Sequence, residues 1–251
     1  MAKAPENTPA RLIYGFHAVS AKLRHVPDAV LEIFLTADRK DARVRKFLAQ
    51  AETAGVRITQ SEGDKLDALV GTRRHQGVVA KVDATRREIK LADVLDSLDE
   101  NALILVLDGV QDPHNLGACL RVADAAGAHA VVAPKDRAVG LNATAVKVAS
   151  GAADTVPYIT VTNLARALRE MQDAGVWVIG AAGEAEKTIH DIDQKVPVAW
   201  VLGAEGDGLR RLTRETCDEL ARIPMHGSVE SLNVSVASGI CLFESRRQRS
   251  A

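Results

Sequence analysis

This 251-residue sequence has few cysteines, no long apolar run and almost no net charge, and each of these features excludes a class of protein. Its three cysteines, Cys119, Cys217 and Cys241, are far apart and form no C-x-x-C pair, so we expect neither a zinc site nor a disulfide framework. Because cysteine packs as a small hydrophobic residue, we predict three buried free thiols.

No apolar stretch approaches the roughly 18 residues that suggest a membrane span. The first 15 residues also lack the apolar region of a signal peptide. Hydrophobic residues make up 47% of the chain, which is enough to bury one large core or two modest ones. We expect a globular cytoplasmic protein with no membrane partner and no bound metal.

The net charge of −1 argues against a uniformly basic nucleic-acid-binding protein, but the charge is unevenly spread. Residues 1–80 carry 13 Lys and Arg against 9 Asp and Glu, so the front of the chain is basic and the remainder acidic. A polyanion would meet the front first, although a solvated helix face explains the charges of residues 38–46 equally well.

Residues 1–83 alternate helical and strand-like patterns, which predicts a small α/β domain. Helices are expected over 17–24, 41–55 and 65–70, with strands over 31–36, 56–60 and 77–82. The polar stretch 84–100 has no continuous apolar face before Leu91, and we expect it to be a linker between two domains.

Residues 101–251 repeat the alternation more strongly, and the apolar run 102–107 suits a strand buried on both faces of a parallel sheet. Further strands are expected over 128–133, 155–160, 176–182, 198–203 and 220–225, and helices over 115–127, 142–150, 163–175 and 231–249. This order predicts a mainly parallel α/β sheet with helices on both faces. Ligands of such sheets bind beyond the carboxyl ends of the strands, where loops 108–117, 203–208 and 224–231 are expected to lie.

The residues of these loops allow a structural and a functional interpretation. Asn115 has the residue type of a helix N-cap, and Arg121 in an apolar helix either extends to solvent or faces a polyanion. Ser231 and Asn233 occupy a predicted helix start, where they could cap free N–H groups or bind a ligand. The glycines around Glu205 match neither the G-x-G-x-x-G dinucleotide fingerprint nor a P-loop.

Together the three loops resemble a known family. N-x(5)-R in "NLGACLR", G-x-E-G-x-G in "GAEGDG" and "IPM-x-G-x(3)-SLNVSVA" match, in order and spacing, the motifs of the SPOUT-class RNA ribose 2'-O-methyltransferases of the SpoU/TrmH family. The front segment, with "IYGFHAV" and "RRHQGVVA", resembles the small L30e-like RNA-binding domain of the branch that methylates guanosine riboses in bacterial 23S rRNA.

The resemblance implies a parallel sheet closed by a deep trefoil knot, with S-adenosyl-L-methionine as cofactor, 23S rRNA as substrate and a homodimer formed through the knotted domain. It places Gly203, Ile223, Met225 and Leu232 at the cofactor. It implies a catalytic set of Asn115, Arg121, Glu205, Ser231 and Asn233. In the front domain, Arg73, Arg74 and Gln76 are the residues we expect to contact RNA, because phosphate binding needs charge and reach.

The implied reaction is attack of a ribose 2'-hydroxyl on the methyl group of S-adenosylmethionine. Some accounts of the family make the arginine at position 121 the general base, but a guanidinium stays protonated in proteins. We therefore favour Arg121 as an electrostatic clamp on the developing alkoxide. Three alternatives are a tRNA ribose methyltransferase, a non-catalytic ribosome-assembly factor and a nicotinamide oxidoreductase, the last disfavoured because its fingerprint is absent.

Overall fold

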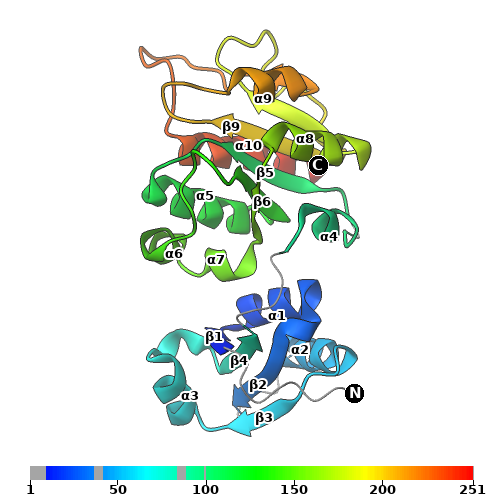
Figure 1. The fold of residues 1–251 in the computed structure, drawn as a ribbon, viewed down its shortest axis with the longest axis vertical. Helices are drawn as coiled ribbons and strands as arrows, with labels where there is room; N and C mark the ends of the chain where they lie inside the picture. The colour runs from blue at the N-terminus through cyan, green and yellow to red at the C-terminus, as the bar shows by residue number, and fades with distance from the viewer. Residues whose placement is uncertain (1–9, 37–41, 84–88, 99, 251) are drawn as a thin grey trace. The chain divides into compact units, whose positions relative to one another are not determined.

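The computed structural model divides the chain into two compact units, Met1–Glu88 and Ile89–Ala251, called unit 1 and unit 2 here (Figure 1). The structure describes residues 10–36, 42–83, 89–98 and 100–250. Within these ranges it contains no helix long and apolar enough to cross a membrane.

Unit 1 contains a four-stranded mixed sheet with the order β1-β4-β2-β3. Only the pair β2–β3 is parallel. The strands are β1 (Ala10–Tyr14), β2 (Val30–Thr36), β3 (Ile58–Ser61) and β4 (Val78–Asp83), and the helices are α1 (Phe16–His25), α2 (Ala42–Thr53) and α3 (Gly63–Val70), with short 3-10 turns at Pro27–Ala29 and Arg73–His75. The sequence did not predict β1, because this edge strand buries only Ile13 and leaves Leu12 and Tyr14 exposed.

Unit 2 contains a six-stranded sheet, β10-β8-β9-β5-β6-β7, in which every strand pair is parallel. The strands are β5 (Leu103–Asp108), β6 (Ala130–Pro134), β7 (Tyr158–Val161), β8 (Trp177–Ala181), β9 (Val198–Gly203) and β10 (Glu219–Ala221). The helices are α4 (Leu91–Leu95), α5 (Pro113–Ala125), α6 (Ala143–Ala149), α7 (Ala152–Thr155), α8 (Leu164–Asp173), α9 (Arg211–Thr216) and α10 (Val234–Arg249). The prediction of a parallel α/β sheet is confirmed.

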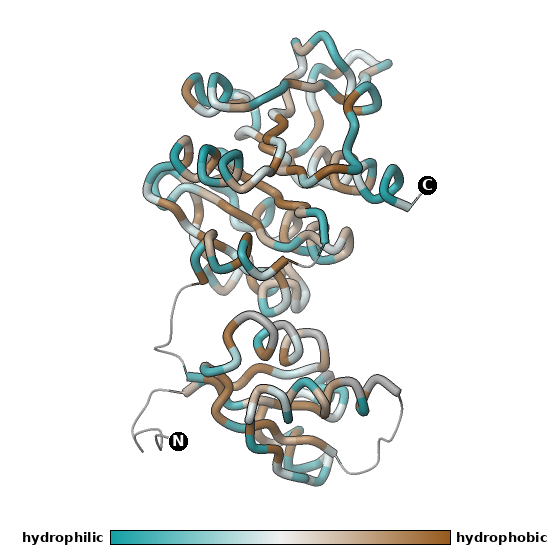
Figure 2. The backbone as a smooth tube through the Cα atoms, turned by 90° about the vertical axis from the view of Figure 1, so that its right-hand side faces the viewer, coloured by the Kyte–Doolittle hydropathy of each residue, from teal (hydrophilic) through white to brown (hydrophobic). Residues whose placement is uncertain are grey.

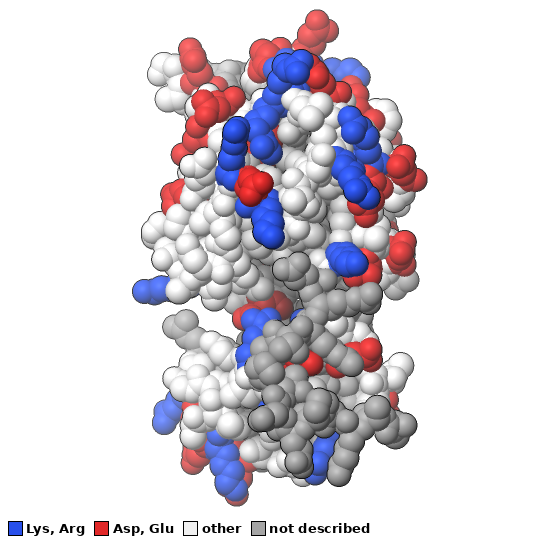
Figure 3. All heavy atoms as spheres, in the orientation of Figure 1, with Lys and Arg blue, Asp and Glu red and all other residues white. Residues whose placement is uncertain are grey.

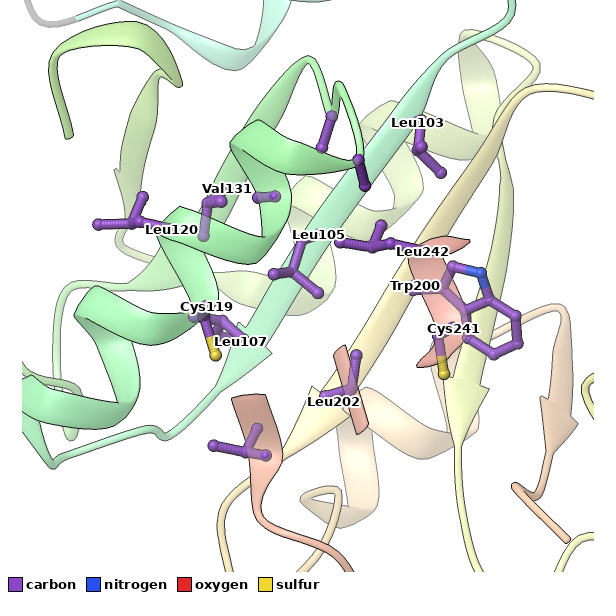
Figure 4. Close-up of a cluster of buried hydrophobic side chains, with 14 of the residues drawn as sticks. Leu103, Leu105, Leu107, Cys119, Leu120, Val131, Trp200, Leu202, Cys241 and Leu242 are labelled. Atoms are coloured by element: carbon purple, nitrogen blue, oxygen red, sulfur yellow. The ribbon is translucent and has the colours of Figure 1, made fainter. Parts of the chain in front are cut away.

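The sheet of unit 2 separates two hydrophobic cores. Leu103, Leu105 and Leu107 of β5 face a core shared with α5, α6, α7 and α10, whereas Ile104 and Val106 face a core shared with α4 and α8. Figure 4 shows the first core, in which Leu120 of α5 lies near Val131 of β6, and Leu242 of α10 lies near Trp200 of β9. Hydrophobic residues concentrate along the interior strands, while the outer helices carry hydrophilic ones (Figure 2). Burial on both faces explains the unbroken apolar run of β5.

Helix α4 lies within the polar stretch that we expected to be a linker. Its Leu91 and Val94 are buried in the core beside α8, so this stretch belongs structurally to unit 2 from Leu91 onward. The short helices α7 and α9 were not predicted either. Helix α10 begins at Val234, three residues later than expected, because Asn233 caps it.

The loop between β8 and β9 touches the chain on both sides of the segment 223–233. Before this segment, the Arg222 N–H donates to the Lys187 carbonyl at 2.9 Å, and the Ile189 N–H donates to the Arg222 carbonyl at 3.0 Å. After it, the Ser245 hydroxyl donates to Gln194 Oε1 at 2.5 Å. The last strand and the last helix are thus attached to one loop.

The three cysteines are free thiols, and Cys119 and Cys241 are buried as predicted, but the prediction of burial is wrong for Cys217. Burial raises the pKa of Cys119 to about 11 and that of Cys241 to about 12. Cys217 is half-buried, and burial raises its pKa to about 12. All three thiols are therefore protonated at neutral pH and act as packing residues.

Candidate active site

Three loops meet at the carboxyl edge of the sheet of unit 2. Asp108, the last residue of β5, is in register with Gly203, the last residue of β9. The loops that follow these two strands therefore start side by side. The third loop follows β10 and ends at α10, which packs against α5 and β9.

Asn115, Glu205 and Asn233 are joined by hydrogen bonds, one residue from each loop. Asn233 Nδ2 donates to Glu205 Oε1 at 2.6 Å and to Asn115 Oδ1 at 2.9 Å, and Asn115 Nδ2 donates to Glu205 Oε1 at 3.2 Å. The Val234 N–H approaches the same carboxylate oxygen at 3.4 Å. We call these three residues the polar triad. The Glu205 carboxylate orients both amides. The triad lies at the protein surface.

Asn233 both caps helix α10 and takes part in the polar triad. Its Oδ1 accepts the Ser235 N–H at 2.9 Å, which caps α10, while its Nδ2 serves the triad. Asn115 is not an N-cap, because α5 begins two residues earlier with Asp112 as its cap and Pro113 at the first position. The capping interpretation of Asn115 is therefore wrong, and its amide is available to Glu205.

The loop 203–208 is a tight hairpin that only glycine permits at its first residue. A Cβ on Gly203 would lie 2.0 Å from the Gly208 carbonyl carbon, and Ala204 pairs with Gly208 across the turn. Gly206 and Gly208 have φ angles of 88° and 65°, in the left-handed region. The hairpin places Glu205 at its exposed tip.

Asp108 anchors the far end of the same hairpin. Its side chain is fully buried, and it accepts the Arg210 backbone N–H at 3.0 Å as well as the Arg210 guanidinium. We did not predict this pair from the sequence. The available signal was an acidic residue at the end of a continuous apolar strand, because a carboxylate there needs a partner.

Arg121 and Ser231 are not joined to the polar triad. Arg121 is exposed on α5, and among the described residues its side chain has neither a hydrogen bond nor an ion pair. Six residues separate it from Asn115, which on a helix is about 9 Å along the axis and about a third of a turn around it. Ser231 is exposed in the loop before α10. Both side chains are accessible to an incoming polyanion.

The residues expected at the cofactor provide partly open apolar surface. Ile223 packs against the core shared with α10, and Met225 and Leu232 are half-buried. Gly203 brings its backbone close to the same loops without a side chain. An adenine ring needs an apolar slot with backbone hydrogen-bond partners, so these residues fit the group chemically.

In unit 1, the buried side chain of His75 fixes the segment 73–76, which is expected to bind RNA. His75 is buried, its Nε2 lies 2.8 Å from Asp67 Oδ1, and its Nδ1 accepts the Gly77 N–H at 2.9 Å. Gln76 is exposed with φ 53°, and Arg73 is 92% exposed with its Nε 3.4 Å from Asp67. The side chain of Arg74 lies outside the described part of the structure. His75 is thus a buried residue that fixes the loop rather than an exposed one that contacts a ligand.

Comparison with protein families assigns both units. A family model described as the SpoU rRNA Methylase family matches residues 102–243, more than half of the chain. The chain belongs to the SpoU rRNA methylase family. A second model, described as RNA 2'-O ribose methyltransferase substrate binding, matches residues 12–87. The family resemblance expected from the three motifs is confirmed.

Relatives of this SpoU chain match it along almost its whole length. It is 63% identical to the 23S rRNA (guanosine-2'-O-)-methyltransferase RlmB of Ralstonia nicotianae, over 96% of this chain and 97% of that protein. It is 58% identical to the RlmB protein of Nitrosomonas europaea, over 97% of this chain and 94% of that protein.

Among solved structures, the AdoMet-bound rRNA methyltransferase from Sinorhizobium meliloti is 25% identical, with a TM-score of 0.61 over 95% of this chain and 87% of that one. The SpoU methyltransferase AviRb from Streptomyces viridochromogenes has the same fold, with a TM-score of 0.64 over 96% of this chain and 90% of that one. The expected SpoU/TrmH fold class is therefore confirmed.

Proposed function

We propose that this chain transfers a methyl group from S-adenosylmethionine to the ribose 2'-hydroxyl of a guanosine in 23S rRNA. The observation that carries the proposal is the polar triad of Asn115, Glu205 and Asn233, assembled from three loops of a SpoU-family chain. The named relatives with 52–63% identity support the choice of 23S rRNA guanosine.

The cofactor would lie against Gly203, Ile223, Met225 and Leu232. When bound, S-adenosylmethionine supplies a methyl group on a positively charged sulfur. The leaving group is good because it departs as a neutral thioether. The protein must then hold the ribose oxygen in line with the breaking bond and assist loss of its proton. An apolar slot that excludes water from the methyl group serves both needs.

Arg121 acts in this proposal as a clamp on the reacting ribose. Its guanidinium has no partner among the described residues, so its positive charge is available to the developing alkoxide and the neighbouring phosphate. The new O–C bond forms as the C–S bond breaks, and the hydroxyl proton passes to phosphate or water. Ser231 and the triad amides orient the ribose from the opposite loops.

A homodimer through unit 2 is part of the proposal. Val236 and Phe243 of α10 are 50% and 51% exposed, and they lie seven residues apart on one face of the helix. Val229, in the loop before α10, is 60% exposed. Such apolar surface beside a site suits a subunit interface. Light scattering at micromolar concentration should give a dimeric mass, and a monomeric mass would refute this part.

We also propose that the C-terminal segment is threaded as a trefoil knot. The β8–β9 loop contacts Arg222 on one side of the segment 223–233 and α10 on the other, which supports threading of the chain through that loop. Ordinary folds avoid such threading, so the knot needs direct proof. When unit 2 is stretched mechanically from both ends, the knot should tighten, and the unfolded chain should remain shorter than its full contour length.

In the proposed domain arrangement, residues 1–83 form an L30e-like RNA-binding domain and 101–251 the methyltransferase domain. Of the stretch 84–100 that we expected to be a linker, α4 packs into the core of unit 2. Arg73, Arg74 and Gln76 contact the RNA. The family match to residues 12–87 supports this role for the first unit. An enzyme that modifies ribosomal RNA works where ribosomes are assembled, so we place it in the cytoplasm.

The test is transfer of labelled methyl from S-adenosylmethionine to unmodified 23S rRNA, 16S rRNA and a tRNA pool, with Arg121→Ala as the control. We expect labelling of 23S rRNA at one alkali-resistant position, lost in the control. Labelling of tRNA alone would keep the chemistry and refute the substrate. Tight cofactor binding without labelling of naked RNA or of assembling ribosomal subunits would favour a non-catalytic assembly factor.

A further inference from the structure

We propose that Lys135 and Arg137, in the loop between β6 and α6, bind the phosphodiester backbone of the RNA beside the reacting ribose. This inference rests on the proposed function and adds a binding site in unit 2. Neither the three sequence motifs nor the family matches assign a role to these two residues.

The loop lies against the hairpin and the first loop of the active site. Strand β6 pairs with β5 in parallel, so the two strands end at the same edge of the sheet. The Val139 N–H donates to the Val110 carbonyl at 2.9 Å. A Cβ added at Gly109 would lie 3.8 Å from the Arg137 carbonyl oxygen and 3.9 Å from Ala204 Cβ. The backbone of Arg137 and the residue that precedes Glu205 therefore both lie beside Gly109.

The backbone of this loop is fixed at three points. Besides the bond to Val110, the Lys135 N–H donates to the Val161 carbonyl at 2.8 Å, and Tyr158 Oη donates to the Val139 carbonyl at 2.9 Å. Long cationic side chains lose much conformational entropy when they bind. A rigid base reduces the part of that loss that comes from the backbone.

Arg137 adopts a backbone conformation that favours glycine. Its φ is 58°, in the left-handed region, which costs an ordinary residue about 1–2 kcal/mol. The only other described non-glycine residues with positive φ are Gln76 and Ser150. A cationic side chain held at a position better suited to glycine, next to the active site, indicates a function for that side chain.

Lys135 and Arg137 are exposed cations on either side of the exposed Asp136 in the sequence. Both side chains are exposed, and neither has a hydrogen bond or ion pair with a described residue. In contrast, several cations elsewhere in unit 2 have acidic partners, namely Lys187, Arg210, Arg211, Arg214, Arg246 and Arg247. Figure 3 shows one face of unit 2, on which Lys and Arg lie among uncharged side chains with an acidic side chain between them and further Asp and Glu toward the edges.

Lack of a partner does not itself mark a site, because exposed Lys195 is also unpaired at the amino end of β9. The position at the carboxyl edge is what distinguishes Lys135 and Arg137. There the planar guanidinium fork can bind two phosphate oxygens, and the ammonium group can bind a neighbouring phosphate as a point charge. The expected ligand is thus an RNA strand that continues past the methylated nucleotide.

The experiment compares the full chain with Lys135→Ala, Arg137→Gly and the double variant, using Lys195→Ala as a control that removes one charge, as each single variant does. Glycine at 137 keeps the left-handed backbone, so Tm should not fall. Binding of a 23S rRNA fragment is titrated at several salt concentrations, and binding of S-adenosylmethionine is measured separately. We expect unchanged cofactor binding and RNA affinity about tenfold or more weaker in the double variant, with the slope of log K against log salt reduced by about 2.

Arg137→Lys should keep the salt slope, since it keeps the charge, but should lose part of the affinity, since it loses the bidentate fork. RNA affinity and salt slope in the double variant equal to those of Lys195→Ala would refute the loop as a phosphate site. This outcome is separate from failure of the proposed function, because RNA binding is read without catalysis. A full chain that binds the RNA through this loop but methylates no RNA would refute the proposed reaction alone.

Discussion

Asp108 and Arg210, 102 residues apart in the sequence, form a pair that closes the glycine hairpin of the active site. The Asp108 side chain is fully buried, whereas the Arg210 side chain is 41% exposed. The hairpin between them carries Gly203 and Glu205, which are expected at the cofactor and in the polar triad. Asp108 is therefore expected to act as a positioning residue, because it fixes the loop that is proposed to contact the ligands.

Arg210→Ala should destabilise the protein by about 1–3 kcal/mol, because it leaves a buried carboxylate with a single hydrogen bond. It should also weaken cofactor binding, since the hairpin loses its anchor. The neighbouring Arg211→Ala is the control, as its ion pair with Glu215 is largely exposed and should contribute less than about 1 kcal/mol. Urea unfolding and calorimetric titration with S-adenosylmethionine test both effects. Equal behaviour of the two variants would contradict the positioning role.

Glu205→Ala should lower methyl transfer by about 10²-fold, because Asn115 and Asn233 lose the acceptor that aligns their amides. Glu205→Gln should keep part of the activity, since its amide oxygen can still accept. Asp207→Ala, in the same hairpin, is the control and should remain near the activity of the unchanged chain. Initial rates with saturating cofactor give the comparison, and full activity in Glu205→Ala would remove the triad from the mechanism.

Stability at acid pH should depend on Glu244 of α10. The Arg247 guanidinium, with help from Gln248 and His190, lowers the pKa of the Glu244 carboxyl to about 2. Because the folded-state pKa is depressed, this group stabilises the fold above its unfolded pKa near 4.3, and the contribution is lost as pH falls through about 2.

Glu244→Gln should therefore be less stable than the unchanged chain by about 1–2 kcal/mol at pH 7, a figure reduced for the exposure of Arg247. The difference should shrink as pH falls from 4 toward 2. Glu215→Gln removes an exposed carboxylate and serves as the control. Urea unfolding at pH 7 and pH 3 measures the effect, and a pH-independent difference would contradict it.

The double variant Arg73→Ala with Arg74→Ala should weaken binding of 23S rRNA by about tenfold or more and flatten its salt dependence. Cofactor binding in unit 2 should not change. Arg57→Ala, at an exposed arginine of unit 1 whose Nε lies 3.8 Å from Glu32, is the control. Filter binding over a salt series tests the prediction, and an unchanged salt slope would exclude both arginines from the RNA interface.

The strong periodic patterns of the sequence predicted most of the fold. The apolar run of β5, in which Leu105 and Val106 face opposite cores, identified a parallel sheet. Weakly apolar elements were missed: α4 buries only Leu91 and Val94 among polar neighbours, and β1 buries only Ile13. The strand order could not be derived from local patterns, because periodicity describes one face of a segment and not its neighbour.

The polar triad could be proposed from the motifs, but its hydrogen bonds could not. The sequence left a cap role for Asn115 open, whereas the structure starts α5 at Pro113 and frees the amide. The sequence also could not predict the partners of Asp108 or the surroundings of Arg137, because both depend on contacts between residues far apart in the chain. A charged residue that ends a buried strand is the local sign that such a contact exists.

The contacts that build the active site span long stretches of chain. Asn115 and Glu205 are 90 positions apart, and Asn115 and Asn233 are 118 apart. Closing such loops is entropically costly and slow compared with forming a helix. During refolding, cofactor affinity should therefore return later than helical content. Cofactor binding would then report that folding is complete, because a partly folded chain lacks the assembled site.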